Sequence, residues 1–365
     1  MGIMPHKQKV FNGLLVKLDK VDMPPEYSPD CANADTFTKG ALKNIKGIEK
    51  YNSVNFGNPI VAIHQLNGHI FSLSGSKLYE GYPDYFTSYG SEGNGVGQFN
   101  HPHSIHYDPA SGFIYVADTT NSRIVKTKID GTGWTTLGTQ GSGVEQLNTP
   151  YGIYYDSASE FIYVADNYNN RLVKTKIDGT GWTILGGFST PTDIHYDLAS
   201  EYIYVMDYGN KRIVKTKIDG TGWTTYGTEG NGVGQFRNPY SIHYDPASEF
   251  IYIADGYINR IVKTKIDGTG WTTYGSAGSG TGQFDSPYGI YYDSTSEFIY
   301  VTDRDNHRLA KTKIDGTGWT TYGSNGSGVG QFKYPHGIYY DAASDYIYVA
   351  DSNNHRIVKT DAGWA

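Results

Sequence analysis

From residue 91 onward, short runs of β-branched and aromatic residues alternate with turn sequences in a pattern that repeats along the chain. The second run of each repeat ends in a phrase such as Ile-Tyr-Val-Ala-Asp, and an arginine follows five residues later. The aspartates are 48 residues apart, except for one interval of 41, and lie at Asp118, Asp166, Asp207, Asp255, Asp303 and Asp351. Such a period is typical of repeat folds built from one supersecondary unit per repeat.

The repeat that starts at Pro239 shows which elements to expect. Its four apolar runs lie at 239–245, 251–255, 260–266 and 271–275. Turn signals separate the runs, which predicts four antiparallel strands. The first two runs are apolar on both faces, as in strands buried between neighbouring sheets, whereas the third alternates more and is expected further out. The pair Asp267-Gly268 supplies the positive φ of a tight hairpin between the third and fourth strands.

Several motifs of the repeat resemble those of the NHL repeat family. In order they are Gly-x-Gly-x-Gly-Gln-Phe at 93–99, Pro102, Tyr-Val-Ala-Asp at 115–118, Asn121 and Arg123. The resemblance covers residues 91–360. It implies an all-β fold, a β-propeller of six or seven blades, each a four-stranded antiparallel sheet. The strand count alone would also allow a β-sandwich.

The number of blades depends on residues 58–90, which repeat the order of four apolar runs without the Asp and Arg. Taken as a seventh copy, they predict a seven-bladed ring; six blades are the alternative if this stretch docks outside it. The last copy stops at 363–365 without a fourth strand, and an open sheet edge has to be covered. We expect residues 11–18 to supply that strand. The predicted organisation is a closing strand and strap at 1–57 and a propeller at 58–365.

Residues 19–57 do not fit the repeat and carry the prolines and turn signals of an extended strap. One interpretation is a linker between the closing strand and the first blade. Ser-Pro-Asp at 28–30, Asn33 and the stretch 40–47 also resemble the strap before the first blade of bacteriophage tail and neck propeller proteins. In those the strap ends near Arg-x-Gly, whereas this chain has Lys46-Gly47 without the Arg. This resemblance implies a virion component that assembles with other virion proteins or with itself as a ring.

The amino-acid composition limits the possible cellular compartments and binding partners of the protein. The 365-residue chain has one cysteine, Cys31, and a formal net charge of −7. A single cysteine excludes a disulfide framework and a zinc site built from paired thiolates. The chain shows neither a signal peptide nor an apolar run of the roughly 20 residues that span a bilayer. We expect a cytoplasmic protein, or a virion protein assembled in the host cytoplasm, without membrane insertion. The acidic balance argues against nucleic acid as a partner.

Residues that recur in every repeat are expected to be structural, because a single active site cannot use six symmetric copies. Asp118 and Arg123, with their equivalents, are therefore expected to hold the turn after the second strand. Departures from the repeat are better candidates for a site. Just after the proline that opens the first strand, six residues should ring one mouth of the central channel: His103, Tyr151, Thr192, Tyr240, Tyr288 and His336. Their rings could bind a glycan or peptide, or simply plug the channel.

Two further features bear on chemistry. Three positions beyond the mouth, the repeats exchange histidine and tyrosine, which indicates packing more than metal binding. Asp193 is a carboxylate near the channel that is unique to its repeat, and it follows the shortened loop at 186–189; together with Thr192 it is the best candidate for a singular site. The mouth positions hold no converging set of metal ligands, and no catalytic motif is present. We predict no enzyme activity, no metal and no cofactor.

The function predicted from the sequence is a non-enzymatic β-propeller scaffold, as a phage tail or neck component that mediates assembly or host-surface contact. Near-identical repeats maintain a ring and a broad surface more readily than a single tuned pocket. Two alternatives stay open. One is a propeller that binds a carbohydrate, such as a surface glycan, or a peptide at the mouth. The other is a metal-dependent lyase or hydrolase of the NHL-like fold.

Overall fold

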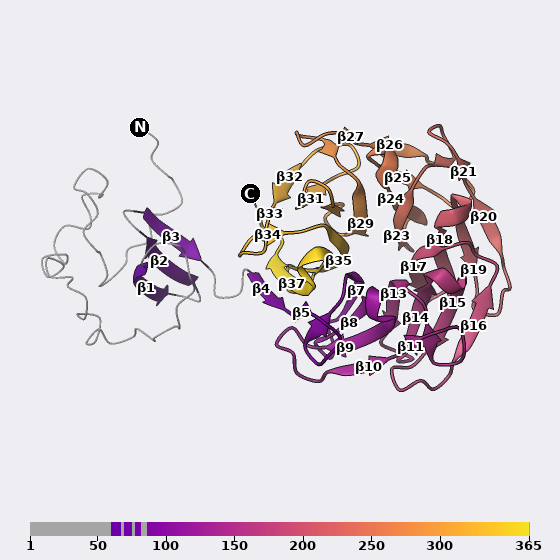
Figure 1. Cartoon of the computed structure of the whole chain (residues 1–365). Helices are drawn as coiled ribbons and strands as arrows, with labels where there is room; N and C mark the ends of the chain where they lie inside the picture. Colours follow the sequence, from indigo (N-terminus) through magenta and orange to yellow (C-terminus); the bar gives the residue numbers. More distant parts are fainter. Residues whose placement is uncertain (1–59, 67–68, 75–76, 82–85, 365) are drawn as a thin grey trace, which may run out of the picture. The chain divides into compact units, whose positions relative to one another are not determined.

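The computed structural model describes residues 60–66, 69–74, 77–81 and 86–364 (Figure 1). The chain divides into two compact units, Met1–Tyr85 and Phe86–Ala365. In the first unit, the described strands β1 (Ile60–Leu66), β2 (His69–Ser74) and β3 (Lys77–Gly81) form one antiparallel sheet. The described residues of the second unit form a ring of six four-stranded antiparallel sheets, here called blades 1 to 6 in the chain order of their innermost strands.

The strands of each blade are given from the ring axis outward. Blade 1 consists of β7 (Pro102–Asp108), β8 (Phe113–Asp118), β9 (Arg123–Thr127) and β10 (Thr135–Leu137). Blade 2 consists of β13 (Pro150–Asp156), β14 (Phe161–Asp166), β15 (Arg171–Thr175) and β16 (Thr183–Gly186). Blade 3 consists of β17 (Pro191–Asp197), β18 (Tyr202–Asp207), β19 (Arg212–Thr216) and β20 (Thr224–Tyr226). Blade 4 consists of β23 (Pro239–Asp245), β24 (Phe250–Asp255), β25 (Arg260–Thr264) and β26 (Thr272–Tyr274). Blade 5 consists of β29 (Pro287–Tyr292), β30 (Ile299–Asp303), β31 (Arg308–Thr312) and β32 (Thr320–Tyr322). Blade 6 consists of β35 (Pro335–Asp341), β36 (Tyr346–Asp351), β37 (Arg356–Asp361) and β4 (Phe86–Tyr89).

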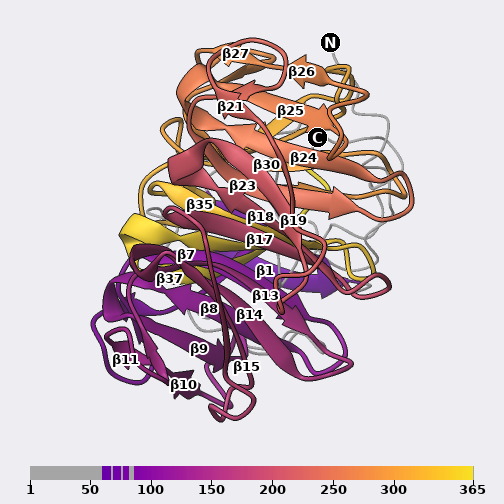
Figure 2. The ribbon, with the colours of Figure 1, turned by 90° about the vertical axis from the view of Figure 1, so that its right-hand side faces the viewer.

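Short 3-10 turns and two-stranded parallel pairs lie on the face of the ring at which the innermost strands begin. A 3-10 turn follows the second strand in five blades: η3 (Thr119–Asn121), η4 (Asn167–Asn169), η5 (Tyr208–Asn210), η6 (Gly256–Ile258) and η7 (Ser352–Asn354). The glycine-rich loops fold into small parallel pairs: β5 (Ser91–Glu92) with β6 (Gln98–Phe99), β11 (Thr139–Gln140) with β12 (Gln146–Leu147), β21 (Thr228–Glu229) with β22 (Gln235–Phe236), β27 (Ser276–Ala277) with β28 (Gln283–Phe284), and β33 (Ser324–Asn325) with β34 (Gln331–Phe332). Figure 2 shows the ring from its side.

The described part of the ring has six blades, so the expectation of seven is wrong and the six-bladed alternative holds. The stretch 58–90 does not act as one blade: β1, β2 and β3 pair only with one another, whereas β4 belongs to blade 6. The innermost strands β35 and β7 lie side by side, which closes the ring without a further sheet. The physical reason is that six blades already complete the circle, so that no gap remains between blade 6 and blade 1; the stretch also lacks the Asp and Arg that fasten the turn in every other copy.

Blade 6 takes its outer strand from the segment that precedes the ring, as predicted, but from a different part of it. The strand is β4, which pairs antiparallel with β37 so that Tyr89 lies opposite Ile357. The predicted strand, 11–18, lies outside the described residues. Phe86 and Tyr89 bring aromatic rings with them, 5.9 Å from the Phe332 ring and 6.4 Å from the Phe99 ring between centroids. The closing strand therefore adds packing as well as backbone pairing.

The core lies between neighbouring blades, where the second strand of one blade packs against the first strand of the next. A tyrosine on each second strand stacks on a tyrosine of the following blade, with centroids 3.9 to 4.4 Å apart. The pairs are Tyr115 with Tyr155, Tyr163 with Tyr196, Tyr204 with Tyr244, Tyr252 with Tyr292, Tyr300 with Tyr340, and Tyr348 with Tyr107. These pairs bury large rings in the apolar layer, as the apolar first and second runs predict.

The recurring Asp and Arg form a structural tie in each blade. In blade 1 the Asp118 carboxylate is fully buried and accepts hydrogen bonds from the Asn100 N–H (2.7 Å), the Asn121 amide (2.9 Å) and the Arg123 Nε (2.7 Å). Arg123 also donates to the Asn94 carbonyl at 2.6 Å. The carboxylate thus joins the glycine-rich loop to the turn between the second and third strands. A buried charge is tolerated when it is paired and hydrogen-bonded in this way.

The predicted Asp-Gly turn forms, but within a loop longer than a tight hairpin: the loop spans residues 265–271 between β25 and β26, and only Gly268 of the pair has a positive φ. Asp267 accepts the N–H of Thr269 at 2.9 Å, and Gly268 adopts a φ of +83°. A Cβ added to Gly268 would lie 2.4 Å from the Tyr226 ring. Both the backbone conformation and the close approach therefore require glycine.

Candidate functional site

The predicted mouth residues come together at the axis of the ring. Each follows the proline that opens an innermost strand, so five blades place a ring at the same level. Tyr240 stacks on Tyr288 (4.2 Å between centroids), Tyr288 on His336 (4.3 Å), and His103 on Tyr151 (3.9 Å); the His336 and His103 rings are 4.5 Å apart. The five rings form a continuous stack, called here the mouth stack.

The centre of the mouth stack is closed by a hydrogen bond between blades 1 and 5. The Tyr288 hydroxyl lies 2.6 Å from the His103 Nε2, and both residues are 7% exposed. Burial, with a smaller contribution from the Arg304 cation, lowers the pKa of His103 to about 3, so the imidazole is neutral at pH 7. The geometry here is that of a plug, the second of the two interpretations of these residues.

Blade 3 breaks the symmetry of the mouth. It carries Thr192 where the other blades carry a ring, and the buried Thr192 Oγ1 has no hydrogen-bond partner among the described residues. The mouth stack is continued instead by Tyr208, at the start of η5, whose ring stacks on Tyr240 at 5.4 Å. Burial raises the pKa of Tyr208 to about 12. A second residue of blade 3 thus extends the aromatic surface away from the axis.

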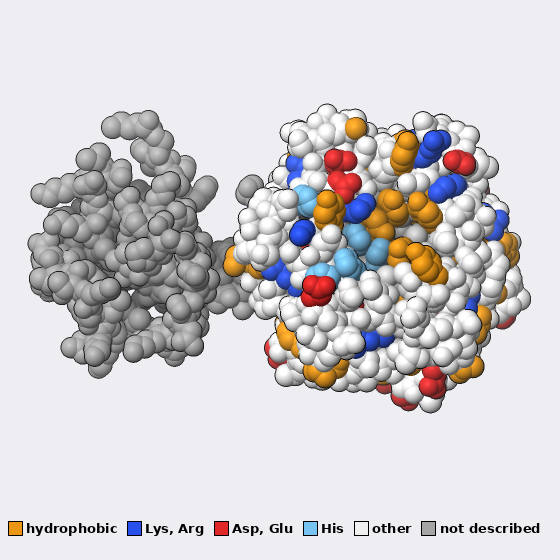
Figure 3. Space-filling view, viewed as in Figure 1, with side chains coloured by type: hydrophobic (Ala, Val, Ile, Leu, Met, Phe, Trp, Pro, Cys, Tyr) orange, Lys and Arg blue, Asp and Glu red, His pale blue; other side chains and the backbone are white. Residues whose placement is uncertain are grey.

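Exposed tyrosines lie on the turns of blades 2 and 4. Figure 3 shows hydrophobic side chains, in orange, beside the pale-blue histidines at the centre of one face of the ring. Tyr168 of η4 is 62% exposed and Tyr257 of η6 is 61% exposed. With Tyr208 and Tyr240 they form what we call the tyrosine strip. Blades 1, 5 and 6 carry Thr120, Asp305 and Asn353 at the positions of Tyr168 and Tyr257.

Cations flank the tyrosine strip. The Lys211 ammonium lies 3.8 Å from the centre of the Tyr208 ring, and the Arg237 guanidinium lies 5.2 Å from that of Tyr257. Both distances are within the range of cation–π contacts. The strip therefore presents exposed aromatic faces together with hydrogen-bond donors.

The shortened loop of blade 3 opens the rim beside the strip, as predicted. Arg212 pairs with Asp207 at 2.7 Å, and among the residues that the structure describes its one other hydrogen bond goes to the Gly187 carbonyl at 3.4 Å. Its side chain is 28% exposed, against 9 to 13% for its five equivalents. Next to it, Trp223 is 37% exposed and packs on Phe188, with ring centroids 5.0 Å apart.

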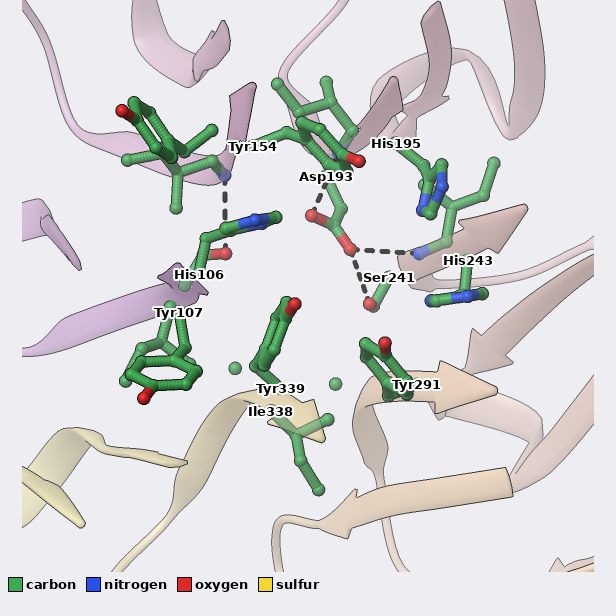
Figure 4. A pocket seen from close by; sticks show the side chains of 18 of the residues that line it. His106, Tyr107, Tyr154, Asp193, His195, Ser241, His243, Tyr291, Ile338 and Tyr339 are labelled. Carbon is green, nitrogen blue, oxygen red and sulfur yellow. Dashed lines mark hydrogen bonds between the residues drawn. The ribbon is translucent and has the colours of Figure 1, made fainter. Parts of the chain in front are cut away.

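Deeper in the channel, the second set of histidines and tyrosines forms a closed ring of aromatic contacts, called here the collar (Figure 4). Its members are His106, Tyr154, His195, His243, Tyr291 and Tyr339. The centroids of neighbouring rings are 4.5 to 5.2 Å apart all the way round, and the ring planes meet at 57 to 65°. The expectation of packing at these positions fits this geometry. In the described part of the chain, no group of three or more metal-binding side chains is found.

Asp193 lies between the mouth stack and the collar, and Figure 4 shows its carboxylate directed into the channel. Its Oδ2 accepts hydrogen bonds from the Ser241 hydroxyl (2.5 Å) and the Ile242 N–H (3.0 Å), and its Oδ1 from the Ile194 N–H (2.9 Å). Burial raises the pKa of Asp193 to about 6 against the opposing effect of these hydrogen bonds. Thr192 and Asp193 are thus adjacent in the chain but belong to different levels of the channel.

The lysines of the perimeter contact the protein itself. Lys126 lies over the Phe113 ring at 4.2 Å, and Lys176 pairs with Glu160 at 3.2 Å. Such contacts recur from blade to blade, with Lys217 and Glu201 in blade 3. The absence of a nucleic-acid partner stays a prediction.

Sequence reasoning missed Tyr168, Tyr208 and Tyr257. All three follow the recurrent aspartate by one or two positions, and the pair of residues at these two positions differs in every repeat. Variation at a turn that the fold brings to the channel mouth is the signal that could have found them.

Comparison with known proteins agrees with this architecture. Residues 99–126 and 332–359 match the model of the NHL repeat. The fold and these matches define the class: the chain is a β-propeller that carries NHL repeats. No curated protein matches the sequence. No helix in the part of the chain that the structure describes has the length and hydrophobicity of a membrane span.

Solved structures share the fold at low identity. A streptogramin B lyase is 17% identical, with 80% of this chain and 86% of that chain covered and a TM-score of 0.52. An auxiliary nutrient binding protein from Bacteroides thetaiotaomicron is 16% identical, with 80% and 82% covered and a TM-score of 0.55. A chain of the nidogen/laminin complex is 17% identical, with 70% and 89% covered and a TM-score of 0.51. At this identity the likeness shows the fold alone, which serves different functions.

Proposed function

We propose that the protein is a non-enzymatic binding propeller whose tyrosine strip recognises a surface glycan. The observation that carries the proposal is that the exposed tyrosines of the described ring, Tyr168 and Tyr257, lie on the turns of blades 2 and 4, while the ring is otherwise near-identical from blade to blade. Packing of the ring does not require them, because blades 1, 5 and 6 carry Thr120, Asp305 and Asn353 at the position that Tyr168 and Tyr257 occupy. Large exposed aromatic residues that the fold does not need are typical of binding surfaces.

The chemistry of the strip suits a sugar. Flat aromatic faces stack on the apolar face of a sugar ring, while hydroxyl and cationic groups bind its hydroxyls. Tyr168 and Tyr257 offer the faces, and Lys211 and Arg237 stand beside Tyr208 and Tyr257 as donors. The rings of the mouth stack pack on one another, so the stack supports the strip, and Tyr240 is the residue that the two share. A non-enzymatic role fits a face that presents aromatic and cationic groups but no converging acid and base.

The virion role is not part of this proposal. The strap resemblance that pointed to a virion lies in residues 28–30, 33 and 40–47, outside the described residues, and no comparison supports a virion role. The near-identity of the blades fits any scaffold or binding propeller. The proposal of a cell-surface or host-surface glycan as partner rests on the tyrosine strip and does not require the strap residues.

We expect Tyr168→Ala and Tyr257→Ala each to weaken glycan binding about tenfold, which corresponds to about 1.4 kcal/mol, because each removes one stacking face. The wild type is first screened on a glycan array, and the affinity of each variant for the strongest ligand is then measured by titration calorimetry. Thr120→Ala and Asn353→Ala are matched controls, since they truncate the equivalent positions of blades 1 and 6 and should leave the affinity unchanged. Absence of glycan binding, or equal loss in all four variants, would refute the proposal.

A further inference from the structure

Asp193 is an unusual residue for the inside of a channel. The innermost strands of the other blades carry only small residues at its position: Ser104, Gly152, Ser241, Gly289 and Gly337. Within the described residues, Asp193 has no Lys, Arg or His within ion-pair distance. Its three hydrogen bonds occupy three of the about four lone-pair sites of a carboxylate, and one on Oδ1 remains.

The described residues that line the cavity carry no positive charge, although the Arg304 guanidinium lies 5.7 Å from the centre of the Tyr288 ring at its mouth end. The cavity around Asp193 has a volume of about 340 Å³ and extends along the innermost strands from His103 and Tyr288 to Asp108 and Asp156, which end β7 and β13. Its lining includes no lysine or arginine. The formal charges that line it are therefore all negative, and the cavity concentrates cations over anions.

The collar histidines add no positive charge to the cavity lining at pH 7. Burial lowers the pKa of His106 to about 3 and that of His195 to about 4, and it lowers the pKa of His243 well below its ordinary value. All three imidazoles are thus neutral at pH 7, and none has a hydrogen-bond partner among the residues that the structure describes. The collar tyrosines, Tyr154, Tyr291 and Tyr339, are neutral as well, since burial raises their pKa values.

These observations together describe an aromatic cage with one carboxylate. Figure 4 shows the collar side chains arranged around the space into which Asp193 points. Aromatic rings attract a cation through the negative charge of their faces, and a nearby carboxylate adds a direct ionic attraction. The cavity volume falls in the range of small-molecule sites. A metal ion fits less well, because the described residues offer no group of three ligating side chains.

We propose that this cavity binds a small organic ammonium ion, held by the Asp193 carboxylate and the rings of the collar. This site is separate from the tyrosine strip and does not depend on the glycan proposal. The strip lies on the turns at the start of the innermost strands, whereas the cavity runs inside the ring toward their other end.

The test uses the full chain and tetramethylammonium as the probe, measured by thermal shift and titration calorimetry at pH 8. Sodium at equal ionic strength corrects for screening, and choline is titrated beside 3,3-dimethylbutanol, the uncharged alcohol that has a carbon in place of the choline nitrogen. We expect saturable binding of tetramethylammonium to the wild type and a rise of its melting temperature. The uncharged alcohol should bind at least tenfold more weakly than choline, because it lacks the charge that Asp193 and the ring faces attract.

Asp193→Asn removes the charge and keeps the size of the side chain. We expect it to weaken tetramethylammonium binding at least tenfold and to abolish the thermal shift. Asp285→Asn is the matched control, since it removes one charge from an exposed position and should behave as the wild type. The melting temperature of each variant without probe shows whether it is folded. Equal binding by Asp193→Asn and the wild type, equal binding of the uncharged alcohol, or no binding to the wild type would overturn the proposal.

Discussion

Deletion of residues 86–89 from the full chain is expected to abolish the stable ring. The deletion removes β4, exposes the edge of β37, and withdraws the rings of Phe86 and Tyr89 from their contacts with Phe332 and Phe99. Truncation of one packed phenylalanine typically costs about 3 to 5 kcal/mol, and the open sheet edge adds a site for aggregation. The total loss is comparable to the stability of a whole domain, about 5 to 15 kcal/mol.

The measurement is thermal unfolding followed by circular dichroism, with size-exclusion chromatography to detect aggregates. Deletion of residues 11–18 is the control, because β4 already occupies the outer position of blade 6 and the ring should keep its melting temperature. A stable ring after loss of 86–89, or collapse after loss of 11–18 alone, would contradict the assignment of β4 as the closing strand.

The sequence predicted the blade well because each blade is encoded locally. The Asp-Gly turn at Asp267, the β-branched runs and the buried Asp118 are repeated signals, and repetition fixes their spacing. The number of blades is a different matter, because it depends on contacts between segments far apart in the chain. Residues 58–90 carry apolar runs in the expected order, yet only β4 joins the ring. Apolar periodicity specifies strands, but it does not specify which edge they pair with.

The candidate site likewise combines features that the sequence could predict with features that it could not. The mouth positions could be predicted from strand direction, since His103 and Tyr288 follow equivalent prolines. That they bond to each other could not, because 185 residues separate them and only ring closure sets their distance. Ser241, the hydrogen-bond partner of Asp193, lies 48 residues away for the same reason. Tyr208 was missed because its position at a turn does not reveal that the ring points toward Tyr240.

Mild acid is the second condition expected to have a large effect, because the channel buries neutral histidines. Burial lowers the pKa values of His103 and His106 to about 3 and of His195 to about 4, and those of His243 and His336 well below the ordinary value. In the unfolded chain these side chains take up protons below about pH 6.5. Protons therefore favour the unfolded chain, and the stability that is present above pH 6.5 is lost as the pH falls toward 3.

The size of this effect follows from proton linkage. Each buried histidine contributes a slope of about 1.4 kcal/mol per pH unit below pH 6.5, which gives about 2 kcal/mol by pH 5. Asp193 acts in the opposite direction, since its raised pKa of about 6 makes its protonation favour the folded ring as the pH falls through that value. Burial also raises the pKa values of Asp118, Asp255, Asp303 and Asp351, and these carboxyl groups add to the offset. We expect a net loss of stability between pH 6.5 and pH 5, because the histidines of the unfolded chain take up protons at a higher pH than its aspartates.

The measurement is the free energy of urea unfolding at several pH values between 7 and 5. We expect a steep fall for the wild type and a slope smaller by about one proton for His195→Gln, which cannot take up a proton in either state. Tyr339→Phe is the control, because it alters the same collar without a group that titrates in this range, so it should shift the free energy equally at every pH. A wild-type free energy that is flat over this range, or a His195→Gln slope equal to that of the wild type, would show that the channel histidines are not held neutral by burial.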